Sequence, residues 1–137
     1  MEQKAIRAGL VAAFGYLIAG IVFGALAGSA ASHQMVVAWR LAAWLFSAGA
    51  FAGHIAYEHI RQHSAPATTA ARAALAASLA GFGLAVAANL HARAASPEHH
   101  STILVLSLVI WPAMIFLPAF IVAFLSALVL GRVRRAA

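Results

Sequence analysis

The sequence predicts an all-α integral membrane protein, a bundle of four membrane-spanning helices that forms a single domain over residues 1–137. Three observations support this class. The chain is 64 % hydrophobic and only 9 % charged, it contains four long apolar runs, and its basic residues gather at the ends of those runs. A soluble fold of this size would have too little polar surface to cover its core, whereas helices in lipid need none at mid-depth.

The first predicted span covers about residues 8–31, which carry no charge and exceed the roughly 20 residues that an apolar helix needs to cross the bilayer. The run is also longer than the apolar core of a typical signal peptide. Within it, Gly20, Gly24 and Gly28 form a GxxxGxxxG series. Such a series lets a second helix approach closely, so we predict a helix-packing face here.

The second predicted span, about residues 38–61, carries a polar stripe with a period of seven residues. Its members are Arg40, Ser47, His54 and Arg61, with Tyr57 and Glu58 beside them. If the helix is regular at about 100° per residue, His54, Glu58 and Arg61 lie within roughly 60° of one another. Gly49 and Gly53 occupy another side of the same helix and would admit another close neighbour.

The third span, about residues 70–92, follows a turn that contains Pro66, and it is rich in alanine. Gly81 lies in a ridge of small residues at four-residue spacing that ends at Asn89, which favours close packing. The fourth span, about residues 102–131, is built from bulky apolar residues instead. We expect this helix to be kinked by two internal prolines, Pro112 and Pro118.

The orientation follows from the distribution of basic residues. Seven of the nine would share one side of the membrane: Lys4, Arg7, Arg61, Arg72, Arg132, Arg134 and Arg135. Only Arg40 and Arg93 belong to the other side, so the positive-inside bias places both termini in the cytoplasm. We expect the bacterial inner (cytoplasmic) membrane as location. A nucleic-acid partner is not expected, because the basic residues do not form a patch with aromatic side chains.

The leading functional hypothesis is an oligomeric channel or transporter that handles protons or ions. Ionisable groups inside a membrane are energetically costly and usually face the interior of a bundle, and histidine titrates near neutral pH. The predicted pathway consists of Arg40, Ser47, His54, Tyr57, Glu58, Arg61 and Asn89. A structural alternative is an i,i+4 pair between His54 and Glu58, with Arg61 reaching to lipid headgroups.

Two further interpretations remain open. The glycine ridges and the proline-containing helix also suit a non-catalytic accessory or assembly subunit of a larger membrane complex. A histidine-ligated zinc, copper or haem b protein is the second alternative. Its candidate ligands lie at the predicted outer ends of the helices: His33, His91, His99 and His100. In the leading hypothesis the protein has no cofactor. We expect no enzyme activity, because cysteine and catalytic motifs are absent from the sequence.

Overall fold

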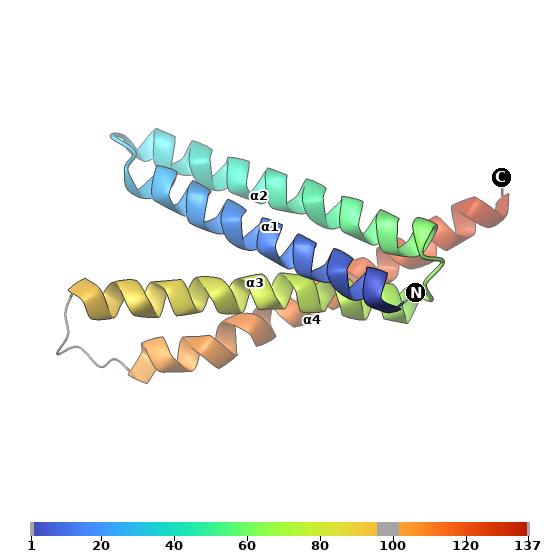
Figure 1. Ribbon diagram of the computed structural model, residues 1–137. Coiled ribbons are helices and arrows are strands. Elements are labelled where there is room, and N and C mark those ends of the chain that lie inside the picture. The colour runs from blue at the N-terminus through green and yellow to red at the C-terminus, as the bar shows by residue number, and fades with distance from the viewer. Residues whose placement is uncertain (1, 96–101, 137) are drawn as a thin grey trace.

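The computed structural model describes residues 2–95 and 102–136, and these residues form helices without any strand (Figure 1). In chain order the elements are α1 (Glu2–Gly28), α2 (His33–Ala56), the single π-helical turn η1 (Tyr57–Arg61), α3 (Pro66–Ala95) and α4 (Thr102–Ala136). Four helices, one of them α2 continued through η1, are long and apolar enough to cross a membrane. The prediction of an all-helical chain with four such helices is therefore confirmed for the described residues.

Most helix ends differ by a few residues from the predicted spans, and the starts of α2 and α3 do so for local reasons. α2 begins at His33 rather than near residue 38, because Ser32 caps it: the backbone of Ser32 is extended, and its Oγ accepts a hydrogen bond from the Met35 N–H at 3.3 Å. α3 begins at Pro66, the residue expected to lie in the turn. Proline suits the first position of a helix, where its missing N–H would have no intrahelical acceptor. Hydropathy alone detects neither feature.

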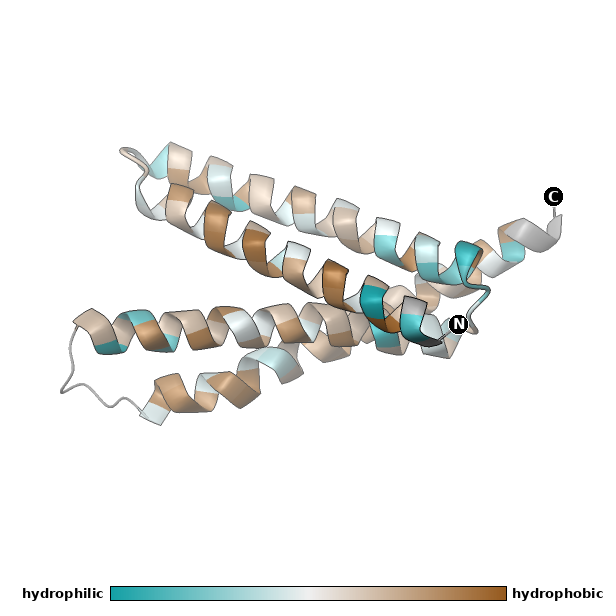
Figure 2. Ribbon diagram, in the orientation of Figure 1, coloured by the Kyte–Doolittle hydropathy of each residue, from teal (hydrophilic) through white to brown (hydrophobic). Residues whose placement is uncertain are grey.

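The four helices form two hairpins, α1 with α2 and α3 with α4. Figure 1 shows the hairpins meeting near the N-terminus and the α2–α3 connection, and diverging toward the opposite end. The most extensive helix interface is the one between α3 and α4. Between the two hairpins, the largest contact is that of α1 with α3, and α2 makes much smaller contacts with α3 and α4. Figure 2 shows hydrophilic residues gathered at the end where the hairpins meet. The two hairpins thus lie close together at the end with the N-terminus and the α2–α3 connection, and this end is also the more polar one.

Small side chains allow the helices to pack closely. α3 buries a row of alanines: Ala70, Ala73, Ala74, Ala76, Ala80 and Ala85. Ile55 of α2 packs with Ala70 and Ala73 and with Ala123 of α4, and this cluster is flanked by partly buried phenylalanines. Since lipid supplies no hydrophobic driving force between helices, such close backbone approach and van der Waals packing hold the bundle together.

The predicted glycine positions fall into two groups. A Cβ at Gly20 would lie 2.7 Å from Leu84, and a Cβ at Gly81 would overlap Ile115, so both glycines mark close approaches between helices. Around the other four, Gly24, Gly28, Gly49 and Gly53, no described atom comes within 4 Å of a Cβ. The GxxxGxxxG series is therefore not a continuous contact face within this chain. Gly83, which the spacing did not indicate, meets Leu17 instead.

We predict that Gly81→Val lowers the free energy of unfolding by about 1–3 kcal/mol, the usual cost of overpacking a filled site. The added methyl groups would collide with Ile115 between α3 and α4. Thermal unfolding in detergent micelles measures the effect. The matched control is Gly15→Val, since Gly15 is also helical and has open space around its Cβ position in the described structure. Equal shifts for the two variants would contradict the close approach at Gly81.

Candidate functional site

A buried ionic cluster lies where the two hairpins meet. Glu58, on η1, has a fully buried side chain, and its Oε2 accepts a hydrogen bond from Arg72 Nη1 of α3 at 3.0 Å. Gln62 Nε2 donates to the other carboxylate oxygen at 3.3 Å, and Ser64 Oγ donates to Oε2 at 3.5 Å. Arg72 also donates to Ser64 Oγ at 3.4 Å. The carboxylate thus has three donors, one of them a cation, as burial of a charge requires.

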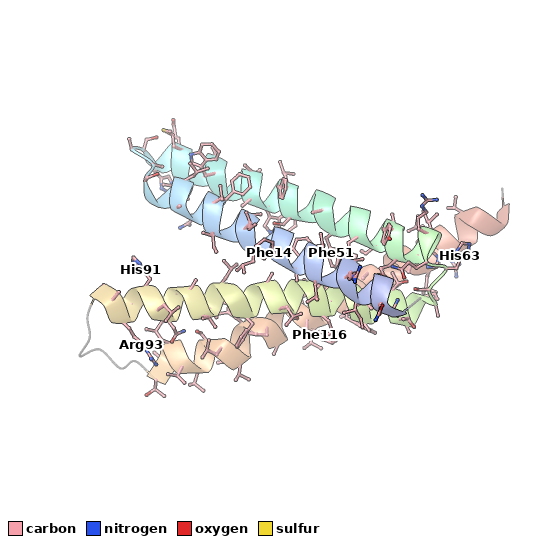
Figure 3. All side chains as sticks on the ribbon, in the orientation of Figure 1. Phe14, Phe51, His63, His91, Arg93 and Phe116 are labelled. Atoms are coloured by element: carbon pink, nitrogen blue, oxygen red, sulfur yellow. The ribbon has the colours of Figure 1, made fainter. Side chains whose placement is uncertain are left out.

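The π-helical turn η1 gives this cluster its geometry. The Gln62 N–H donates to the Tyr57 carbonyl, five residues back, at 3.3 Å, and the Ser64 N–H donates to the Glu58 carbonyl at 3.4 Å. Between them His63 adopts a left-handed backbone conformation, with φ of 53°. Figure 3 shows His63 beside this turn. A π turn holds one extra residue, so the angular spacing of a regular α-helix does not continue through it.

The partner of Glu58 therefore differs from the predicted one. The structural alternative paired Glu58 with His54 and let Arg61 reach to the lipid headgroups, whereas the ion-pair partner of Glu58 is Arg72. Arg61 and Tyr57 are exposed. From the sequence, Arg72 was predicted only as a topology signal, and no role was predicted for Ser64 or Gln62. The available signal was an arginine near the start of an alanine-rich helix, a short connection after a glutamate in an apolar segment.

His54 lies one helical turn before Glu58 and is 6 % exposed. Neither of its ring nitrogens has a hydrogen-bond partner among the described residues. The hydroxyl of Thr69, which is fully buried on α3 one turn before Arg72, also lacks one there, as does Nδ1 of His59. Unpaired buried polar atoms are uncommon in folded proteins. Among the described residues, the hydroxyl of Tyr16 on α1 is the other such atom, and the rest belong to residues near the ionic cluster in the chain, so this end of the bundle is the candidate site.

The remaining pathway residues lie in other surroundings. Ser47 lines an apolar groove of about 1040 Å³ to which all four helices contribute. Arg40 lines a smaller cleft of about 360 Å³ between α1 and α2. Neither His54 nor Glu58 lines these two cavities of the described chain. The polar stripe on α2 therefore does not open into a single cavity.

Asn89 has a packing role rather than a place beside the stripe. Its Nδ2 donates to the carbonyls of Ala85 at 2.8 Å and Leu104 at 2.7 Å, and to Ser107 Oγ at 3.3 Å. Nearer the middle of the helix, Ser78 Oγ donates to the Pro112 carbonyl at 3.0 Å. The bonds to Leu104, Ser107 and Pro112 join α3 to α4 within the second hairpin, whereas the bond to Ala85 lies within α3. Hydrogen bonds of this kind are a common means of joining helices in membranes.

The predicted metal ligands are not brought together in the described part of the chain. His33 and His91 are exposed, and Figure 3 shows His91 with Arg93 at the end of α3 remote from the ionic cluster. His99 and His100 lie outside the described residues. Over residues 2–95 and 102–136, no three histidine, aspartate or glutamate side chains lie close enough to hold a metal ion.

No protein-family model matches this chain, and comparison with curated proteins and with solved structures finds no match either. A functional conclusion therefore rests on the chemistry of the buried groups. Their distinctive property is that Glu58 is fully compensated by its neighbours, while His54, one turn away, is buried without a hydrogen bond.

We predict that Arg72→Gln lowers the free energy of unfolding by about 3 kcal/mol, the lower end of the range for breaking a buried ion pair, because the Arg72 side chain is 33 % exposed. The change leaves the Glu58 carboxylate buried without its cation. Combining it with Glu58→Gln removes the stranded charge and should restore most of the loss. Chemical unfolding of the two single variants and the double variant in detergent measures the coupling.

The matched control is Arg61→Gln, which changes an exposed arginine at the same end of the bundle. We expect its effect to stay within about 0.5 kcal/mol, as for surface substitutions generally. A loss for Arg72→Gln that is no larger than this, or a double variant as unstable as the sum of the single ones, would show that the ion pair does not join the hairpins.

Proposed function

We propose that this chain is a proton-handling channel or transporter of the bacterial inner membrane, in which His54 carries the exchanged proton. The observation that supports this function is the buried imidazole of His54, unpartnered in the described structure and one turn from the fully buried Glu58. Ionisable groups are rare within membrane helices and usually serve a pathway. Imidazole is the side chain whose charge changes most readily near neutral pH.

The proposed mechanism is an exchange of partners at Glu58. With His54 neutral, the carboxylate is held by Arg72 of the other hairpin. Protonation of His54 creates a second cation four residues before Glu58, and in the proposed exchange this cation reaches the same carboxylate. The imidazolium then competes with Arg72, whose partly exposed guanidinium can turn toward water. Since Glu58 and Arg72 belong to different hairpins, a proton on His54 would loosen their junction.

The proposed proton route begins at the ionic cluster. Arg72, Gln62 and Ser64 are all partly exposed at this end of the bundle, which the distribution of basic residues assigns to the cytoplasm. Beyond His54, the groove lined by Ser47 is mostly apolar. In the proposed function the polar stripes of neighbouring copies complete the route, which is why an oligomer is part of it. The proposal keeps both termini cytoplasmic and α4 bent at Pro112 and Pro118.

We predict that His54→Gln reduces proton flux at least tenfold in liposomes loaded with a pH-sensitive dye, because glutamine retains a polar side chain but does not titrate; a contribution of about 10²–10⁴-fold is typical of a positioned proton-transfer group. The matched control is His91→Gln, which changes an exposed histidine at the other end of the bundle. Its flux should equal that of the unchanged protein. Undiminished flux in His54→Gln would refute the role assigned to His54.

A second candidate function is supported by the open glycines of α2. Gly49 and Gly53 are exposed and have no described atom within 4 Å of a Cβ position, so this face is free to receive another helix. In that case the chain serves as a non-catalytic accessory or assembly subunit, and the ionic cluster only joins its hairpins. Retained proton flux in His54→Gln together with dependence of assembly on these glycines would favour this second function.

We predict that Gly53→Ile reduces the oligomer to smaller species in native mass spectrometry, because the branched side chain prevents close helix contact at this face. Gly15→Ile is the control, since Gly15 is an exposed glycine on α1 outside the predicted contact pair. An unchanged subunit number in Gly53→Ile would remove this face from the assembly.

A further inference from the structure

Arg40 is a cation without an ion-pair partner in the described structure, and it lies well inside α2. It follows the start of that helix at His33 by seven residues, or about 10 Å at 1.5 Å per residue. Glu58 lies at the opposite end of the helix and is bonded to Arg72. An arginine two residues inside the predicted span of about residues 38–61 needs either an anion or a path for its side chain to water.

The side chain of Arg40 borders a cleft between α1 and α2 with a volume of about 360 Å³. The other lining residues are small or apolar: Gly20, Phe23, Gly24, Ala27, Gly28 and Ala43. Over Gly24 and Gly28 no described atom lies within 4 Å of a Cβ position. The cleft is therefore lined by one basic residue and by glycine backbone, and it has space for an anionic group of a lipid. A guanidinium matches phosphate oxygens in two-pronged hydrogen bonding.

The cleft adjoins the large groove, because Gly20 lines both. Along α2 the groove extends from Trp44 to Ala56, about 18 Å at 1.5 Å per residue. Its wall is built mainly from apolar side chains of α2, α3 and α4, and α1 contributes Tyr16 and Gly20. Proceeding from Arg40 toward the middle of the bundle, the surface thus changes from a single positive charge to an elongated apolar channel. This order of polarity matches that of an anionic amphiphile lying along the membrane normal.

We propose that the cleft and the groove form one binding site for an anionic phospholipid, with the phosphate on Arg40 and an acyl chain in the groove. Basic pockets between membrane helices bind anionic headgroups elsewhere, and the apolar groove supplies the matching site for the chain. This site shares no residue with the ionic cluster. It does include Arg40 and Ser47, which also belong to the polar stripe on α2. The two proposals are therefore distinguished by their measurements, lipid binding for this site and proton flux for His54.

The test measures quenching of Trp44, which lines the groove, in a protein whose other tryptophans are changed by Trp39→Phe and Trp111→Phe. Vesicles of phosphatidylcholine contain an equal mole fraction of either phosphatidylglycerol or phosphatidylcholine with brominated acyl chains. We expect the brominated phosphatidylglycerol to bind about fivefold more strongly, the factor expected for one basic residue at an anionic lipid surface. Equal quenching by the two lipids would overturn the proposal.

Three variants test whether the preference for phosphatidylglycerol arises at this site. Arg40→Gln should abolish it, whereas Arg40→Lys should keep part of it because the charge remains. Gly24→Leu should also abolish it, since the leucine side chain fills the cleft while leaving Arg40 unchanged; the open space over Gly24 makes this variant compatible with folding. Circular dichroism and size-exclusion chromatography establish that each variant is folded before quenching is compared.

Arg93→Gln is the matched control, because Arg93 is an exposed arginine at the same end of the bundle and borders neither cavity (Figure 3). It should retain the full preference. A preference that survives both Arg40→Gln and Gly24→Leu, or that Arg93→Gln abolishes equally, would show general attraction to surface charge and overturn the site. If Arg40→Gln fails to fold, loss of the phosphatidylglycerol preference in Gly24→Leu supports the proposal by itself.

Discussion

The ion pair between Glu58 and Arg72 joins the two hairpins at the end of the bundle where they meet. In an apolar solvent a carboxylate with no exposed surface is tolerated only when its charge is compensated and its oxygens are hydrogen-bonded. Arg72 supplies the charge from the other hairpin, and Gln62 and Ser64 supply the remaining donors. Because α2 makes few other contacts with α3 and α4, this pair and the small cluster around Ile55 hold it to them.

The two hairpins are not equally tight. α3 and α4 interlock through buried alanines and through the bonds made by Ser78 and Asn89, so the second hairpin is a firm unit. The first hairpin touches it mainly through α1, and an open groove lined by all four helices runs along α2 from Trp44 to Ala56. A change in charge at the junction would therefore act on the contact between hairpins. The proposed proton site lies at that junction, whereas the proposed lipid site consists of this groove and the cleft beside Arg40.

The sequence identified the important segment but not its internal geometry. His54 and Glu58 were singled out because ionisable groups are costly in lipid, and both are buried. One alternative paired Glu58 with His54 on the same helix, whereas the structure pairs Glu58 with Arg72 of α3, and the residues from Tyr57 to Arg61 form a π turn. The role of Arg72 was missed for a related reason. Spacing along one helix says nothing about which residue of another helix stands opposite.

Composition and hydropathy by themselves determined that the chain is helical, with four helices long enough to cross a membrane. The reason is that backbone N–H and C=O groups in lipid find no water, and a helix supplies their hydrogen bonds within one segment. The tertiary structure decided which glycines pack against another helix. Gly20 faces Leu84 and Gly81 faces Ile115, whereas the Cβ positions of Gly24 and Gly53 have open space around them. The tertiary structure also decided that Arg72 compensates Glu58, leaving the buried His54 without a bond. Apolar periodicity specifies which face of a helix is buried, but contacts between helices depend on their separation and rotation, which only packing fixes.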